Sequence, residues 1–161
     1  MAIEIQVAAT KQDAAGMPAQ KLLRNWARAA LAAEVESQAV TIRVVGADEG
    51  TTLNETYRPT KHGPTNVLSF PFEAPPGVKT NILGDIVICA PVVAREAKEQ
   101  GKNVAAHWCH MVIHGVLHLQ GFDHVKAVDA KKMEAKEIDV LHKLGFGDPY
   151  AYGERNSLVT A

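Results

Sequence analysis

The sequence predicts an α+β fold in which helices cover a small mixed β-sheet of about four strands. Two kinds of segment lead to this prediction. Short stretches with alternating or β-branched apolar residues are typical of strands, and longer stretches with apolar residues at helical spacing are typical of helices. Their order along the chain is too irregular for a regular doubly wound parallel sheet.

Strand and helix patterns alternate in the first part of the chain. AIEIQVA alternates apolar and polar residues, and QAVTIRVVG is rich in β-branched residues, so both segments predict strands. Pro18 suits the first turn of the helix between them, and the helix after the second strand is expected to be capped by Asp48 and stopped by Pro59. The expected elements are strands at 2–8 and 38–46 and helices at 18–34 and 48–58.

The second part of the chain predicts a strand pair followed by helices. NVLSFPF and LGDIVIC are strand-like, and the turn-rich EAPPGVKTN between them favours an antiparallel pair with a long connection. Pro91 suits the start of the next helix, Asn103 can cap the helix after it, and Gly121 can end that helix. The expected elements are strands at 66–72 and 83–89 and helices at 91–100, 104–120 and 128–144.

Length and composition indicate one globular domain. The chain has 161 residues, of which 47% are hydrophobic and 22% are charged, and this is enough to bury a core. We expect the domain to occupy residues 1–150, with a flexible tail at 151–161. The formal net charge is −1, so a polyanion would have to be bound by a local basic patch or by a metal ion.

The cysteines and the N-terminus favour a cytoplasmic protein. Cys89 and Cys109 lie in apolar segments without a CxxC partner, which is typical of buried thiols in a reducing compartment. The N-terminal residues lack the basic and apolar regions of a secretory signal, and no apolar run reaches the ~18 residues of a transmembrane helix. We therefore expect a soluble, cytoplasmic protein that does not interact with membranes.

Three histidines in HGVLHLQGFDH, at 114–124, have the spacing of a metal site. His114 and His118 are four residues apart on a predicted helix, so both rings can face the same ion. Gly121 can adopt the left-handed conformation that ends the helix, and the chain can then return His124 as a third ligand. Three neutral ligands leave the fourth tetrahedral position open, which is typical of a catalytic zinc ion.

Two other interpretations of this helix are weaker. A histidine pair four residues apart is often only a pair of hydrogen-bonded core residues, but the glycine and the third histidine favour a metal site. His107 and His110 fall on the same helix face, and no nearby turn could supply a third ligand at that end. We expect His107 and His110 to support the site or to pack in the core.

The spacing also resembles the zinc signature of the metzincin proteases, HExxHxxGxxH. Gly115 stands at the position of the glutamate, which is the general base in those proteases. A site without that base favours a phosphodiester substrate, because a metal ion and a guanidinium can stabilise the charge of its transition state. Arg58 is the candidate guanidinium, although an arginine at the end of a helix is more often a solvated charge.

Four segments together resemble the YbeY family of metal-dependent endoribonucleases, also called rRNA maturation factors. The segments are LNETYR at 53–58, PTNVLSFPFE at 64–73, LGDIVIC at 83–89 and HWCHMVIHGVLHLQGFDH at 107–124. Their order and spacing match the family over nearly the whole chain, except for the tail after Tyr150.

The resemblance implies residue roles and partners. His114, His118 and His124 match the family's zinc ligands, and Arg58 matches its functionally important arginine. Many family members have aspartate where this chain has Asn66, so we expect a loop-fixing hydrogen bond there rather than a role for a carboxylate. The resemblance also implies cleavage of single-stranded RNA, maturation of the 3′ end of small-subunit 16S rRNA and ribosome quality control. The implied partners are the small ribosomal subunit, ribosomal proteins and a ribosome-associated GTPase.

The expected mechanism combines one Zn²⁺ ion at the three histidines with Arg58, which would hold the scissile phosphate while Lys61 and His62 help to hold the strand. Either water or the RNA 2′-hydroxyl could be the nucleophile. Ser69 and Asp85 lie in matching strands and are assigned no chemistry. Two other functions stay open. One is a zinc hydrolase of peptides or small molecules, which the missing glutamate disfavours, and the other is a ribosome-assembly binding protein whose zinc is structural.

Overall fold

The structure is a computed structural model that describes residues 3–151. In this range the strands are β1 (Ile3–Val7), β2 (Ala39–Val45), β3 (Val67–Pro71) and β4 (Ile82–Cys89). The helices are α1 (Gln20–Ala30), α2 (Ala47–Tyr57), α3 (Ala90–Glu99), α4 (Val104–Leu119) and α5 (Ala127–Lys143), and a short 3₁₀ helix, η1, spans Ala33–Val35. The predicted α+β class with a single domain is confirmed. The predicted flexible tail, 151–161, lies outside the described residues except for Ala151.

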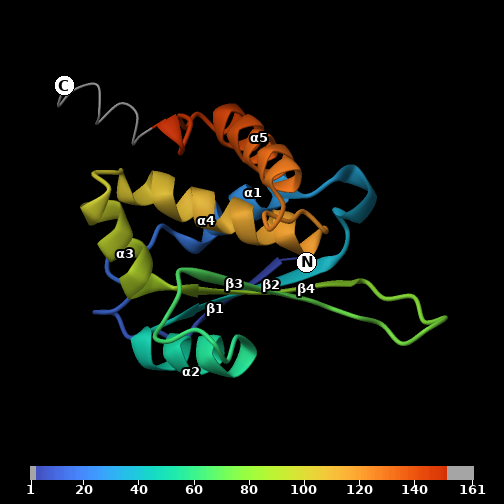
Figure 1. Ribbon diagram of the computed structural model, residues 1–161, viewed down its shortest axis with the longest axis horizontal. Helices are drawn as coiled ribbons and strands as arrows, with labels where there is room; N and C mark the ends of the chain where they lie inside the picture. The colour runs from blue at the N-terminus through green and yellow to red at the C-terminus, as the bar shows by residue number, and fades with distance from the viewer. Residues whose placement is uncertain (1–2, 152–161) are drawn as a thin grey trace.

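The four strands form a mixed sheet, as predicted. The strand order is β1-β2-β4-β3, with β1 and β4 parallel to β2 and with β3 antiparallel to β4. In the predicted strand pair, Val67 lies opposite Ile88 and Pro71 lies opposite Gly84. β3 is an edge strand, which is where a sheet tolerates a proline. The long connection between β3 and β4 projects from the body of the molecule (Figure 1).

Helices cover both faces of the sheet. α4 lies between the sheet and α5 on one side, and α2 lies on the other side (Figure 1). The side chains of β4 alternate accordingly: Ile86 and Ile88 belong to the main core, which includes α4, whereas Val87 and Cys89 belong to a smaller core under α2. Burial on both faces explains why the sequence of β4 is almost continuously apolar.

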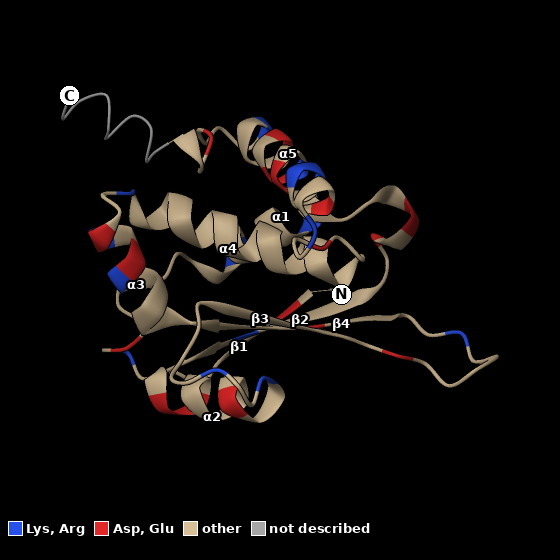
Figure 2. Cartoon of the chain, viewed as in Figure 1, with Lys and Arg blue, Asp and Glu red and all other residues tan. Residues whose placement is uncertain are grey.

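α4 is the central helix. Its predicted cap is confirmed, because the side chain of Asn103 accepts a hydrogen bond from the backbone N–H of Ala106 at 3.1 Å. The helix contacts α1, α3, α5, β3 and β4, and Figure 2 shows that it carries no lysine, arginine, aspartate or glutamate. A helix enclosed in this way is apolar nearly all round, so each polar side chain on it needs a partner from another element.

The first helix differs from the prediction at both ends. α1 begins at Gln20 rather than at Pro18, and it ends at Ala30 rather than near Glu34, where η1 forms instead. The side chain of Gln120, just after α4, supplies hydrogen bonds at this point. It donates to the carbonyl of Ala30 at 2.7 Å and accepts from the backbone N–H of Ala32 at 2.8 Å. Helical spacing within the segment cannot reveal a partner so distant in the chain.

The cap of the second helix also differs from the prediction. α2 begins at Ala47 after Gly46, and Asp48 lies in its first turn without capping it. A negative charge in the first turn still favours the helix through its dipole. The predicted stop before Pro59 is confirmed, since α2 ends at Tyr57. Within the described residues, no helix has the length and apolar character that crossing a membrane requires.

Candidate metal centre

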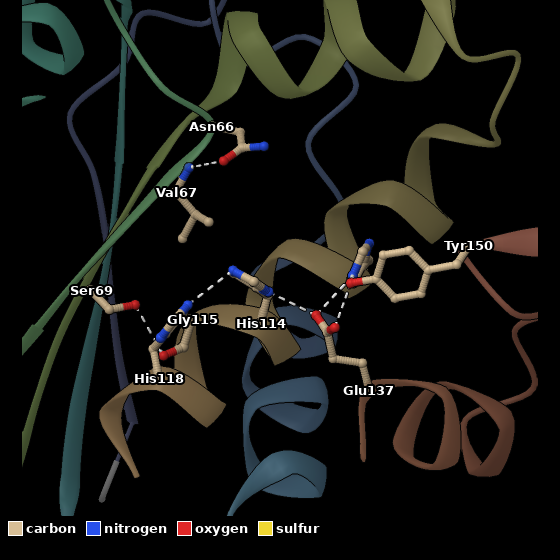
Figure 3. Close-up of polar contacts among 9 residues, drawn as sticks. Asn66, Val67, Ser69, His114, Gly115, His118, Glu137 and Tyr150 are labelled. Carbon is tan, nitrogen blue, oxygen red and sulfur yellow. Dashed lines mark hydrogen bonds and ion pairs between the residues drawn. The ribbon is translucent and has the colours of Figure 1, made fainter. Parts of the chain in front are cut away.

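Three histidines converge at the C-terminal end of α4. One ring nitrogen from each of His114, His118 and His124 lies within 4.8 Å of the other two. The Nε2 atoms of His114 and His118 face each other at 3.2 Å (Figure 3). Two ligands about 2.0 Å from one tetrahedral ion are roughly 3.3 Å apart. The pair therefore has the separation that a shared ion of this size requires.

A helix-ending glycine brings the third histidine to the other two. Gly121 has a φ of 97°, the left-handed conformation expected from the sequence. The N–H groups of Gly121 and Phe122 donate to carbonyls of the last turn of α4, which is the hydrogen-bond pattern of a Schellman motif. The side chain of Asp123 then accepts from the backbone N–H of His124 at 2.7 Å and fixes the returning chain.

Burial keeps His118 in the form that binds a metal ion. Loss of hydration, and next the nearness of His114 and His124, lowers the pKa of His118 to about 4. The ring is therefore neutral at pH 7, and a neutral imidazole has a lone pair for a metal ion. No proton has to leave His118 before an ion can bind.

A buried carboxylate that the sequence analysis did not include lies behind His114. Glu137 of α5 is 0% exposed, and its Oε2 is 2.8 Å from Nδ1 of His114 and 2.8 Å from Nε2 of His110. Tyr150 donates its hydroxyl to the other oxygen, Oε1, and Figure 3 shows the carboxylate between His114 and Tyr150. Burial alone would raise the pKa of Glu137, but these hydrogen bonds outweigh it and lower the pKa to about 2.

The same contacts create a second group of possible metal ligands, His110, His114 and Glu137. The expectation considered only a nearby turn as the source of a third ligand at the His110 end; the carboxylate instead comes from α5, which the sequence analysis did not consider. One nitrogen of each ring, Nε2 of His110 and Nδ1 of His114, already lies at hydrogen-bond distance from the carboxylate, so these atoms have partners without an ion. The rings of the three-histidine group are not joined by a carboxylate and line a cleft, which makes this group the better candidate for a metal site.

The cleft has a volume of about 540 Å³ and brings Arg58 together with the three histidines. Its lining residues are Tyr57, Arg58, Thr65, Asn66, Val67, Leu68, Ser69, Pro71, His114, His118 and His124. None of these residues is acidic. Lys61 and His62, which the sequence analysis grouped with Arg58, are exposed and do not belong to this lining.

The end of α2 holds Arg58 at the cleft. The backbone N–H of Arg58 donates to the carbonyl of Asn54 at 2.7 Å, and its carbonyl accepts from Lys61 at 2.8 Å. The neighbouring Tyr57 packs edge-on against Phe70 of β3, with the ring centroids 4.6 Å apart. Arg58 is exposed, and within residues 3–151 no carboxylate forms an ion pair with it. Its guanidinium is therefore available to an anion in the cleft.

Asn66 makes hydrogen bonds that fix the loop before β3. Its Oδ1 accepts from the backbone N–H of Val67 at 2.7 Å, and its Nδ2 donates to Glu96 at 3.0 Å. Glu96 in turn lies 2.9 Å from Nε2 of His107. Asn66 therefore joins the edge of the cleft to a buried histidine of α4 through one carboxylate.

Gly115 leaves no room for the glutamate of the protease signature. A Cβ atom at this position would lie 2.8 Å from Cγ2 of Ile86 in β4. The carbonyl of Gly115 also accepts a hydrogen bond from Ser69 of β3 at 3.1 Å, so Ser69 has a structural contact (Figure 3). Asp85 is exposed and does not line the cleft. Among the described residues, the cleft thus offers no carboxylate as a general base.

Comparison with known proteins gives one family. The family model for endoribonuclease YbeY matches residues 4–145. A protein of Alteromonas mediterranea named endoribonuclease YbeY is 54% identical over 135 residues, which cover 83% of this chain and 85% of the relative. A protein of Methylococcus capsulatus with the same name is 52% identical over 146 residues, which cover 91% of this chain and 95% of the relative.

A solved structure supports the fold. The solution structure of a Thermotoga maritima protein matches with a TM-score of 0.56 and 24% sequence identity, and the match covers 88% of this chain and 91% of that protein. At this identity the likeness concerns the fold alone. The family model and the two relatives cover most of the chain, and we conclude that the chain belongs to the YbeY family.

Proposed function

We propose that the protein is a metal-dependent endoribonuclease that cleaves single-stranded RNA. The observation that carries this proposal is the cleft of about 540 Å³ in which Arg58 and three candidate metal ligands face the same space. Hydrolysis or transfer of a phosphodiester needs positive charge around the non-bridging oxygens, and a guanidinium with a metal ion supplies it. Family membership supports the same activity, because both relatives are named endoribonucleases.

Zn²⁺ is the proposed ion, with His114, His118 and His124 as its ligands. The 3.2 Å separation of two Nε2 atoms and the neutral state of His118 support this assignment. Imidazoles also bind copper, nickel and iron, so the choice of zinc depends on availability as well as on the ligands. When bound, the ion would supply a Lewis acid at one side of the cleft.

The chain's own residues define the remaining chemistry. Arg58 is proposed to hold the scissile phosphate, since a guanidinium stays charged at any physiological pH and can bind two phosphate oxygens at once. The absence of acidic residues from the lining of the cleft favours a polyanionic substrate. Lys61 and His62 follow Arg58 on an exposed loop, so their proposed contacts with the strand lie outside the cleft.

We also propose the cellular role that the resemblance implies. The substrate would be the 3′ end of 16S rRNA, and the partners would be the small ribosomal subunit, its proteins and a ribosome-associated GTPase. A cytoplasmic location is proposed with it. The two cysteines are buried and free, which fits a reducing compartment.

Cleavage of a defined RNA by the full chain tests the proposal. The zinc-loaded protein should cut a 5′-labelled single-stranded RNA, and a strong chelator should stop the reaction until zinc is restored. Ends with a 2′,3′-cyclic phosphate would identify the RNA 2′-hydroxyl as the nucleophile, whereas 5′-phosphate ends would identify water. Failure of the zinc-loaded protein to cut any single-stranded RNA, or cleavage of a peptide that depends on His114, would contradict the proposal.

A further inference from the structure

Glu137 connects the metal centre to the chain that follows α5. Its Oε2 is bonded to both His110 and His114, and its Oε1 accepts the hydroxyl of Tyr150. We propose that Glu137 and Tyr150 are positioning residues that hold His114 in the tautomer and orientation needed to bind the metal ion, and so set the affinity of the centre. This inference rests on the metal site of the proposed function.

The carboxylate determines which nitrogen of His114 can bind an ion. A neutral imidazole has one N–H and one lone pair. Glu137 accepts the hydroxyl proton of Tyr150 on one oxygen and faces two imidazole nitrogens with the other, so it acts as an acceptor throughout. His114 must then donate from Nδ1, which leaves the lone pair on Nε2. Nε2 is the atom that lies 3.2 Å from Nε2 of His118.

The packing of α5 holds the carboxylate where this bond requires it. Glu137 is 0% exposed and occupies the buried face of α5, beside Met133 and Leu141. A side chain enclosed in this way has little freedom to move away from His114. Metal-binding histidines commonly donate their second nitrogen to such a carboxylate, which fixes the ring and makes the ligand more basic.

Tyr150 extends this support to the end of the described chain. Its ring packs edge-on against His110 with centroids 5.4 Å apart, and its hydroxyl is 3.3 Å from Nε2 of the same histidine. The segment before it is anchored in the main core, because Phe146 packs edge-on against Trp26 with centroids 5.8 Å apart. With Oε1 held by the phenol, the carboxylate cannot rotate, and Oε2 stays directed at the histidines. Docking of this segment is thus coupled to the metal centre.

Zinc affinity of the full chain, measured by competition with a chromophoric chelator, tests the proposal without RNA. Glu137→Gln should weaken zinc binding by about 10–100-fold. Tyr150→Phe should weaken it less, and it should add little in a Glu137→Gln background because Tyr150 acts through Glu137. Glu96→Gln is the matched control: it removes the carboxylate partner of His107, on the same helix, and should leave zinc affinity unchanged.

The tautomer of His114 gives a second readout, because a Glu137 that only stabilised the fold would not determine which nitrogen of His114 carries the proton. In the zinc-free wild-type protein, ¹⁵N NMR of the side chain should show the proton on Nδ1, and Tyr150→Phe should retain the fold and keep most of this population. A wild-type His114 with its proton on Nε2 would overturn the proposal even if Glu137→Gln did not fold. Equal loss of zinc affinity in Glu137→Gln and Glu96→Gln would also overturn it. Because neither readout uses RNA, the proposal can fail while the proposed nuclease stands, and the reverse.

Discussion

The histidines in the first half of α4 differ from those in its second half, although all lie on one helix face. His107 and His110 are 3% and 6% exposed, and each is bonded to a carboxylate from another helix. His118, in the last turn of α4, faces Nε2 of His114 and lines the cleft, and among the described residues no carboxylate is bonded to its ring. His114 belongs to both groups, with Nδ1 on a carboxylate and Nε2 on the cleft side. Spacing alone does not separate the buried histidines from the proposed metal ligands; the partner of each ring nitrogen does.

The largest expected effect comes from removing a histidine of the cleft group. His118→Ala should abolish tight zinc binding and lower RNA cleavage at least ~100-fold. The fold should persist, because this side chain lies at the cleft rather than in the core. Zinc titration and circular dichroism of the same sample check both points. A variant that keeps the wild-type zinc affinity would contradict the comparison.

Arg58→Ala should sharpen the comparison by separating metal binding from catalysis. RNA cleavage should fall by about 100–1000-fold. Zinc affinity and melting temperature should not change, since Arg58 is exposed and forms no ion pair among the described residues. Arg58→Lys should recover only part of the activity, because an ammonium cannot bind two phosphate oxygens in the same plane. Full rRNA processing by Arg58→Ala in cells would instead support an assembly protein with a structural zinc ion.

His107→Ala should produce the opposite pattern in the buried group. The substitution leaves a cavity and takes a hydrogen-bond partner from Glu96, so stability should fall by about 2–4 kcal/mol. Urea unfolding at neutral pH measures this loss. The fraction that remains folded should bind zinc as tightly as the wild type. A weaker zinc affinity in that fraction would place His107 in the metal centre and break the comparison.

Gly115→Ala should have the smallest effect of the four substitutions. The new Cβ would lie 2.8 Å from Cγ2 of Ile86, and overpacking of this kind costs about 1–3 kcal/mol. Ile86→Ala removes the opposing methyl group. The double variant should therefore lose less unfolding free energy than the sum of the losses in the two single variants, Gly115→Ala and Ile86→Ala. Strict additivity would show that α4 does not rest on β4 at this point.

The features that the sequence predicts are those whose causes are local. The proposed metal ligands come from one helix and the turn after it, so their spacing together with Gly121 could mark them as candidates. The cap at Asn103 and the antiparallel pair of β3 and β4 are visible for the same reason. Arg58 is different: its position at a helix end made it a candidate guanidinium, but a solvated charge was the commoner interpretation, and the family resemblance decided between the two.

The features that the sequence does not predict depend on contacts between distant segments. Glu137 interrupts an apolar face of α5, between Met133 and Leu141, and this pattern could have marked it as a buried carboxylate. The pattern cannot say which helix that face contacts, so the hydrogen bond between Glu137 and His114 could not be predicted from it. The early end of α1 at Ala30 has the same cause, since the hydrogen-bond partner there is Gln120, which follows the far end of α4.

A crystal structure of the zinc-loaded protein, with anomalous data at the zinc edge, tests the central claim most directly. The account predicts one peak at about 2.0–2.1 Å from Nε2 of His114, Nε2 of His118 and a ring nitrogen of His124, with no fourth protein ligand. Nδ1 of His114 should still be bonded to Glu137. A peak between His110, His114 and Glu137, or a fourth side chain that closes the site, would contradict it.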